Sequence, residues 1–232
     1  MSLRLLAFAL PVLIAGQPAL AAERSFTVVG FERIRLDGPY SVKLTTGVAP
    51  FARAKGSSAA LNGLSVEVQG QTLIIRPSRS SWGGYPGKDP GPVEISIGTH
   101  DLTKVWLNGA GALAIDSVEG QSFDMTVQGP GSIALGKLDV DRLNLGLAGS
   151  GSAVVGGKTK NATIIVRGSA SLDGSGLTAK DAIVGAEGSA VVRLGVTGTV
   201  KIDALGTASI AIAGDPACKL RTVGSATVSG CR

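Results

Sequence analysis

The sequence contains 232 residues, of which 34 are glycine, whereas only two are tryptophan, two tyrosine and five phenylalanine. Hydrophobic residues make up 44% of the chain and charged residues 17%, a balance that excludes an intrinsically disordered protein, and the glycines follow no collagen-like triplet. The formal net charge of +5 comes from basic residues scattered singly, without the interleaved aromatics of a nucleic-acid site, so no nucleic-acid partner is expected.

Residues 1–21 have the three parts of a secretory signal peptide: a basic residue near the start, an apolar stretch, and Ala-Leu-Ala at the end. The apolar stretch is interrupted by Pro11 and is shorter than the roughly 20 residues that cross a bilayer, so no transmembrane span is expected. We predict cleavage after Ala21 and a periplasmic or secreted protein. The mature chain, residues 22–232, is expected to form a single β-helix domain.

The region from residue 26 to residue 101 is predicted to form irregular, wider turns of short β-strands. Apolar and polar residues alternate there with the period of strands that have one buried face, over residues 31–36, 41–44, 64–68, 73–75 and 93–97. Glycines between these segments mark turns. We expect three or four such turns, continuous with the regular part that follows.

The longest insertion between these predicted strands holds the best candidate for a ligand-binding site. Arg79, Trp82, Tyr85 and Lys88 combine flat aromatic rings with cationic donors, a combination that suits sugar faces and anionic groups. The predicted ligand is a glycan or another polymer of the cell envelope. The alternative is that the insertion only covers a flank of the fold.

Residues 102–232 contain a repeat. A short corner of the form Gly-x-Gly or Gly-x-Ala recurs every 18 to 20 residues, and its first glycines are Gly109, Gly129, Gly149, Gly168, Gly188, Gly206 and Gly224. The positions four and two residues before each first glycine, and four and six after it, are mostly apolar. Each unit therefore reads as two short strands bent at the corner.

A unit of about twenty residues without a helix cannot bury its apolar face alone, but successive units can coil so that equivalent side chains stack in interior columns. The sequence therefore predicts an all-β protein, a single-stranded parallel β-helix with about 20 residues per turn. The strong preference of parallel connections for a right-handed path predicts a right-handed coil. An antiparallel β-sandwich is the alternative, but it does not require seven corners at so constant a spacing.

The sequence predicts no catalytic site, no metal site and no cofactor. The acidic residues between 101 and 203 fall into no single column, and close pairs such as Asp139 and Asp141 are typical of solvated turns rather than of a glycosidase dyad. His100 has no nucleophile motif around it and is expected at the surface. The Gly-x-Gly corners are followed by strands instead of a helix, which argues against a dinucleotide-binding loop.

Two further features concern the repeat. Hydroxyl residues recur beside the corners and are expected to form ladders between turns, with a flat partner-binding face as the alternative; they include Ser132, Ser152, Ser171, Ser209 and Thr227. Cys218 and Cys231 are expected to form a disulfide that secures the last turn, with free thiols as the alternative. The unpaired strand edges at the ends of a β-helix, and its flanks, leave oligomer formation open.

The order of these segments resembles the putative auto-transporter adhesin head GIN domain family. The resemblance rests on Phe31-x-x-Ile34, on the pattern from Gly38 through Val42 and Leu44 to Gly47, on the strands at Leu73 and Val93, and on the repeated glycine corners. It implies an exported, right-handed β-helical protein, with adhesion suggested by the family's name, and it brings no catalytic residues.

We therefore predict a non-enzymatic binding module of the cell envelope or surface, similar to an adhesin. A polysaccharide-active lyase or hydrolase, and a purely structural envelope scaffold, are the alternatives.

Overall fold

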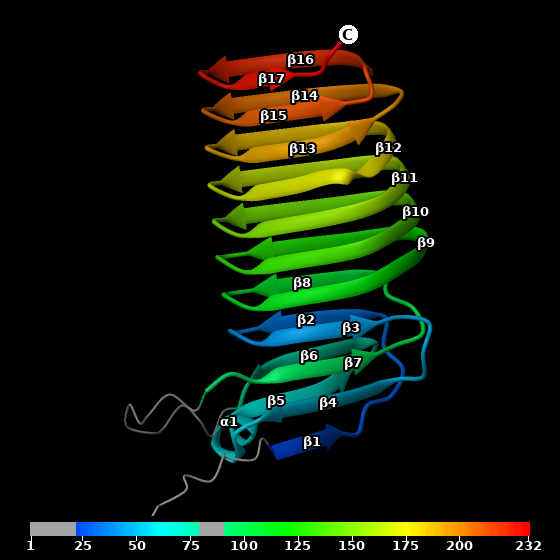
Figure 1. Ribbon diagram of the computed structural model, residues 1–232, viewed down its shortest axis with the longest axis vertical. Helices are drawn as coiled ribbons and strands as arrows, with labels where there is room; N and C mark the ends of the chain where they lie inside the picture. The colour runs from blue at the N-terminus through cyan, green and yellow to red at the C-terminus, as the bar shows by residue number, and fades with distance from the viewer. Residues whose placement is uncertain (1–21, 79–90) are drawn as a thin grey trace, which may run out of the picture.

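The computed structural model describes residues 22–78 and 91–232, and it confirms the right-handed parallel β-helix (Figure 1). Its strands join in one sheet that winds around the long axis of the molecule. The strands are β1 (Ala22–Phe26), β2 (Arg33–Asp37), β3 (Ser41–Thr45), β4 (Phe51–Gly56), β5 (Leu64–Gln69), β6 (Thr72–Pro77), β7 (Glu94–Gly98), β8 (Lys104–Asn108), β9 (Ala112–Gln128), β10 (Ser132–Gly149), β11 (Ser152–Gly168), β12 (Ser171–Gly188), β13 (Val191–Val196), β14 (Thr199–Gly206), β15 (Ser209–Ala213), β16 (Ala217–Gly224) and β17 (Thr227–Ser229). A single short helix, α1 (Ser58–Asn62), accompanies them in the described part of the chain.

The regular turns stack with equivalent residues in register. Leu145 of β10, for example, pairs with Met125 of β9 in the turn before and with Ile164 of β11 in the turn after. All three side chains are buried, as are almost all members of the four apolar columns up to residue 212. The core is therefore a narrow stack of aliphatic side chains, as the repeat predicts.

The corner glycines are required by backbone conformation. All seven first glycines of the corners have positive φ, between +83° and +107°. Glycine adopts this region at no steric cost, whereas residues with a Cβ rarely do. The spacing read from the sequence thus corresponds to one left-handed residue in every turn.

Differences in turn length are absorbed away from the corners. The register shifts between Leu135 and Leu138 of β10, and again between Val154 and Gly157 of β11. A larger shift follows Gly174 of β12, where the turns shorten. The parts of each strand before and after these shifts consequently keep their register, while the segment between them changes length.

The N-terminal strands stack out of chain order, which the sequence analysis did not predict. Strand β2 pairs with β6 on one side and β8 on the other, and β3 lies likewise between β7 and β9. The turn made by β2 and β3 is therefore inserted between two turns that come later in the sequence (Figure 1). The predicted strands are confirmed as β2, β3, β5, β6 and β7, whereas β1, β4 and α1 were not predicted.

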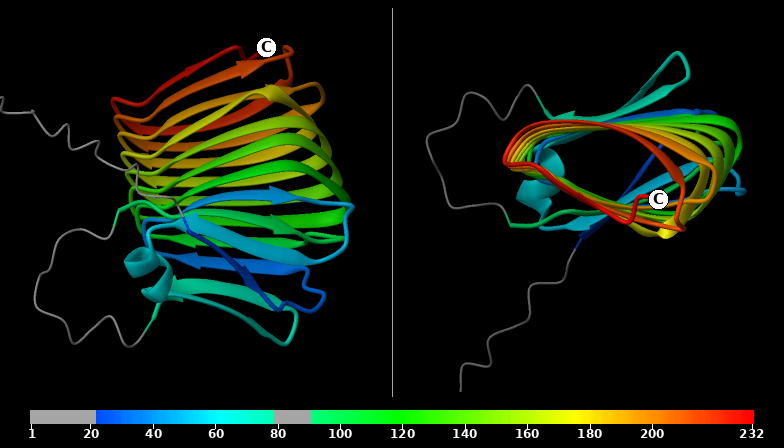
Figure 2. Two further views of the ribbon diagram at one scale, coloured as in Figure 1. Left: turned by 60° about the horizontal axis from the view of Figure 1, so that its bottom comes forward. Right: turned by 90° about the horizontal axis from the view of Figure 1, so that it is seen from above.

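The two ends of the coil differ. At the N-terminal end, β1 and β4 add antiparallel strands, β5 and β6 form an antiparallel hairpin, and α1 buries Leu61 beside them (Figure 2). At the C-terminal end, β16 and β17 each pair on one side only within the described chain. Leu220 is consequently 48% exposed, although Ile202, its neighbour in the same column, is fully buried.

Candidate functional site

One outer side of the coil carries a ladder of ion pairs. In each pair, a lysine reaches an acidic residue of the preceding turn at 2.8 to 3.2 Å, and the pairs are Lys137–Glu119, Lys158–Asp139 and Lys160–Asp141. Exposed pairs of this kind contribute little to stability. The two carboxylates of the close pair Asp139 and Asp141 each have a lysine of the next turn as their partner.

A second outer side is flat and built from small residues. Ser132, Ser152 and Ser171 follow one another in register along it. One contact of the predicted hydroxyl ladders occurs beside the corners, where the Ser169 and Ser189 hydroxyls lie 3.4 Å apart. The Thr207 hydroxyl donates instead to the backbone carbonyl of Gly188. This side offers hydroxyl groups.

The third outer side, which we call the grooved face, is the outward surface of β6, β2, β8, the second halves of β9 to β12, β14 and β16. Four hollows of about 550, 420, 400 and 260 Å³ lie on it. Two of them, of about 420 and 400 Å³, share Trp106 at the N-terminal turns, and the other two follow along the axis of the coil towards the last turn. The grooved face is therefore the part of the described surface best shaped to hold an extended ligand.

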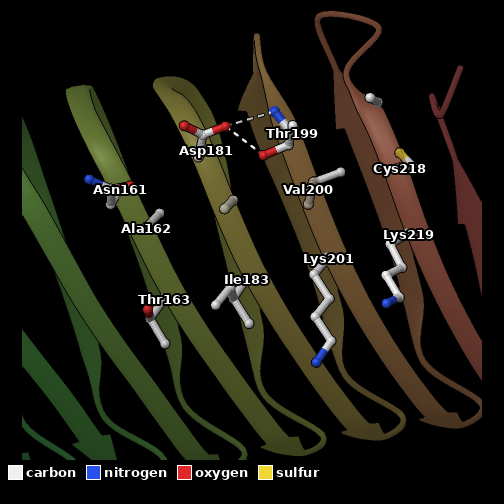
Figure 3. Close-up of a pocket in the computed structure, with 12 residues that line it drawn as sticks. Asn161, Ala162, Thr163, Asp181, Ile183, Thr199, Val200, Lys201, Cys218 and Lys219 are labelled. Atoms are coloured by element: carbon white, nitrogen blue, oxygen red, sulfur yellow. Dashed lines mark hydrogen bonds between the residues drawn. The ribbon is translucent and has the colours of Figure 1, made fainter.

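The largest hollow, which we call the C-terminal groove, crosses β11, β12, β14 and β16 (Figure 3). Ala162 and Ala182 line it from buried positions between two rows of outward-facing residues, and Lys201 and Lys219 extend from neighbouring strands. Ile183 adds an apolar side chain that is 51% exposed. The groove thus combines the exposed side chain of Ile183 with two cationic side chains.

Asp181 stands at one edge of this groove and is held by Thr199 of the next turn. One of its carboxylate oxygens accepts hydrogen bonds from the hydroxyl of Thr199 at 2.6 Å and from the backbone N–H of Thr199 at 2.9 Å (Figure 3). These bonds favour the charged carboxylate and hold the pKa of Asp181 below its ordinary value. Asp181 is therefore held in its ionised form, and one of its two carboxylate oxygens is engaged by Thr199.

Replacing Thr199 with valine should raise the pKa of Asp181 towards its ordinary value, because the stronger of the two bonds is lost. A carboxyl-detected NMR titration measures this shift, and Thr207→Val, a matched change without a contact to Asp181, should leave that pKa unchanged. Because the pKa is lower in the folded than in the unfolded chain, the stabilisation is present above the unfolded pKa and is lost as the pH falls through the folded one. An ordinary pKa for Asp181 in the unmodified protein would contradict this assignment.

A second hollow, of about 420 Å³, surrounds Trp106 at the N-terminal end of the grooved face. The tryptophan lies on β8, points outward and is half-buried, and the ammonium group of Lys104 lies 4.6 Å from its ring centroid. Gln69 and Thr72, at the tip of the β5–β6 hairpin, line the same hollow. Figure 2 shows this hairpin projecting from the coil, so the hollow has a sheet as its floor and the hairpin as a wall.

Polar side chains beside Trp106 are fixed in orientation. The carboxylate of Asp37 accepts a hydrogen bond from the amide of Asn108 at 2.6 Å and pairs with the guanidinium of Arg35 at 2.8 Å. Gln128 also lines the hollow, and no hydrogen bond from its side chain occurs within the described residues. This arrangement presents an aromatic ring next to amide and guanidinium donors.

Trp106 was not among the residues predicted to bind a ligand, although the strand period in the sequence indicates that it faces outward. Trp106 stands between Val105 and Leu107, which belong to two buried columns, so the two-residue period of a strand places it outside. The four residues that were predicted to bind ligand, Arg79, Trp82, Tyr85 and Lys88, lie outside the described residues. His100 is exposed, as predicted.

Residues 22–78 and 91–232 contain neither a cluster of metal ligands nor a helix that could span a membrane. In these ranges, no group of three or more His, Cys, Asp or Glu side chains is placed to hold a metal ion. No helix there has the length and apolar character that crossing a membrane requires.

The disulfide between Cys218 and Cys231 is present, with 5.6 Å between the Cα atoms.

Several solved structures share this fold. A putative adhesin from Bacteroides fragilis superposes with a TM-score of 0.77 at 18% identity, over 90% of this chain and 95% of that one. A putative lipid binding protein from Parabacteroides distasonis gives 0.69 at 20% identity, and a putative adhesin from Parabacteroides merdae gives 0.68 at 15% identity, both with the same coverage. At these identities the likeness concerns the fold alone.

No curated protein matches the sequence. The model of the family described as putative auto-transporter adhesin, head GIN domain, matches residues 30–216, which is most of the chain and includes all but the last turn of the coil. The protein therefore belongs to the head GIN domain family of putative auto-transporter adhesins.

Proposed function

We propose that this protein is an exported, non-enzymatic binding module that holds a glycan of the cell envelope or of another surface on its grooved face. Membership of an adhesin-head family and solved structures named putative adhesins support a surface-binding role. The ion-paired carboxylates of the ladder favour binding over hydrolysis. A signal peptide over residues 1–21 would direct export and be removed by cleavage after Ala21.

The hollow around Trp106 is the observation that carries this proposal. An outward-facing indole ring supplies a flat apolar surface for the C–H face of a sugar, and its polar surroundings supply partners for hydroxyl groups. Asn108 and Arg35 are already oriented by Asp37, so little side-chain entropy is lost when a ligand binds. Because further hollows follow along the same face, the ligand is expected to be a chain of sugars lying along the axis.

The insertion that carries Arg79, Trp82, Tyr85 and Lys88 is proposed to contribute a second aromatic contact. Its ends are anchored at Pro77, the last residue of β6, and at Val93, which precedes β7. Strand β6 also carries Thr72 of the Trp106 hollow. The insertion and the hollow thus share one strand as their support.

Screening the mature protein on an array of glycans and peptidoglycan fragments identifies a ligand, and titration calorimetry then measures its affinity. Trp106→Ala should weaken binding by about tenfold or more, since aromatic anchors in partly desolvated sites contribute above 1 kcal/mol. Trp106→Phe should retain part of the affinity. Val154→Ala, on the flat side of the coil, removes another exposed apolar group and should have no effect.

Unchanged binding by a folded Trp106→Ala protein would contradict the assignment of the site. In that case, Trp82→Ala and Tyr85→Ala test whether the insertion binds alone. Release of reducing sugars or unsaturated products from any glycan on the array would overturn the non-enzymatic assignment.

A further inference from the structure

We propose that the C-terminal groove is a separate site for anionic groups, and that it takes the carboxylate or sulfate groups of an acidic polysaccharide. This site lies at the opposite end of the grooved face from Trp106. It recognises charge instead of an apolar sugar face, so it does not depend on the Trp106 site.

The first argument is the register of two lysines. Lys201 of β14 and Lys219 of β16 are direct neighbours on adjacent parallel strands, about 4.8 Å apart along the axis. Both side chains extend from the same surface of the sheet (Figure 3). Like charges directly opposite each other in a sheet are destabilising. An anion bound between the two ammonium groups would remove this repulsion.

The second argument is the shortage of acidic partners at the groove. Lys201 reaches Asp203 only at 3.9 Å, and in the described part of the chain Lys219 forms no ion pair. Arg221, the register neighbour of Asp203 on β16, is exposed and likewise has no ion pair among the described residues. Strands β14 and β16 therefore carry three outward cationic groups on the grooved face but one carboxylate, that of Asp203, which lies 3.9 Å from Lys201.

The ion-pair ladder on another side of the same coil shows what closely paired lysines look like in this fold. There, each lysine of the three pairs lies within 3.2 Å of an acid from the preceding turn. Lys201 and Lys219, at the groove, have no partner within that distance among the described residues. Asp181, the acid that lines the groove, has one oxygen already occupied by Thr199 and points towards that residue (Figure 3).

The lining of the groove favours a polysaccharide among anionic partners. Asn161 and Thr163 present an amide and a hydroxyl group to a sugar backbone beside the exposed Ile183, while its acidic groups reach the lysines. The lining includes no aromatic side chain on which nucleic-acid bases could stack.

The test titrates the protein with polygalacturonate and with dextran sulfate, using neutral dextran of similar length as the uncharged probe. Both acidic polymers should bind at low salt, neutral dextran should not compete with them, and affinity should fall as the salt concentration rises. The double variant Lys201→Gln/Lys219→Gln should weaken binding by about tenfold. Lys43→Gln/Lys158→Gln makes the same change of net charge on the other two sides and should leave the affinity within about twofold.

Equal losses in the two double variants would overturn the proposal, because they would show attraction to net charge instead of a site. Binding to anionic lipid vesicles without binding to either acidic polymer would overturn it too. Trp106→Ala should leave polygalacturonate binding intact, so failure of the glycan site and failure of the anion site give different results. Chemical-shift changes confined to β12, β14 and β16 would support the location.

Discussion

Replacing Gly151 with alanine should lower the free energy of unfolding by about 2–3 kcal/mol. A Cβ atom at this position would lie 2.7 Å from the carbonyl oxygen of Gly131, 2.8 Å from that of Gly129 and 2.9 Å from a methyl carbon of Val127. The first two are backbone atoms of the preceding turn, so the clash cannot be relieved by a change of rotamer. The register of two turns would have to shift, and urea denaturation followed by circular dichroism measures the cost.

Gly146→Ala is the matched control. Gly146 lies five residues earlier, on the grooved face of β10, and a Cβ atom there would meet nothing within 4 Å. Its effect should stay within about 0.5 kcal/mol, as for most surface substitutions. Equal destabilisation by the two substitutions would show that loss of glycine flexibility, and not the clash at the corner, determines the result.

The corners also show why the repeat predicts the core so well. The third residue of one corner is Gly151, and the buried residue two positions before that corner is Leu147. In another corner the third residue is Ala190, and the buried residue two positions before it is Ala186. A Cβ atom at Gly131 would lie 2.8 Å from a methyl carbon of Leu107, and one at Gly151 would lie 2.9 Å from a methyl carbon of Val127. These two glycines thus leave room for large side chains of the preceding turn. Seen from above, the coil becomes narrower towards its C-terminal end (Figure 2), where the corners are 18 residues apart.

The N-terminal turns could not be predicted to the same degree, because no repeat links them. Alternation of polar and apolar residues identifies a strand such as β2, but it does not identify the neighbours of that strand. β2 lies between β6 and β8, which begin 39 and 71 residues after it. Pairings of this kind depend on the closure of long loops, which leaves no local pattern in the sequence.

The candidate sites were predictable in part. The two-residue period places Trp106 outside, and the 18-residue spacing of the last turns places Lys219 beside Lys201. The hollows themselves depend on the combined heights of side chains from four strands, and on a hairpin whose position is not local. Sequence reasoning therefore identifies which residues face outward but not which of them share a hollow.

Removing the disulfide should destabilise the last turn by about 3 kcal/mol, the expected entropic contribution of a loop of this length. The double variant Cys218→Ser/Cys231→Ser tests this without leaving a free thiol. Amide hydrogen exchange should become faster in β16 and β17 while it stays unchanged in β9 to β11. The reason is that each turn of a solenoid contacts only its neighbours, so the loss does not spread along the coil.

The same double variant separates the two proposed sites. Lys219 follows Cys218 on β16, so loosening of the last turn moves one of the two lysines that define the anion site. Binding of polygalacturonate should therefore weaken, whereas a glycan bound at Trp106, six strands away in the stack, should keep its affinity. Uniformly faster exchange along the coil, or equal losses at the two sites, would show that the disulfide supports the whole coil and not its end. The bridge would then act as a general stabiliser of the fold.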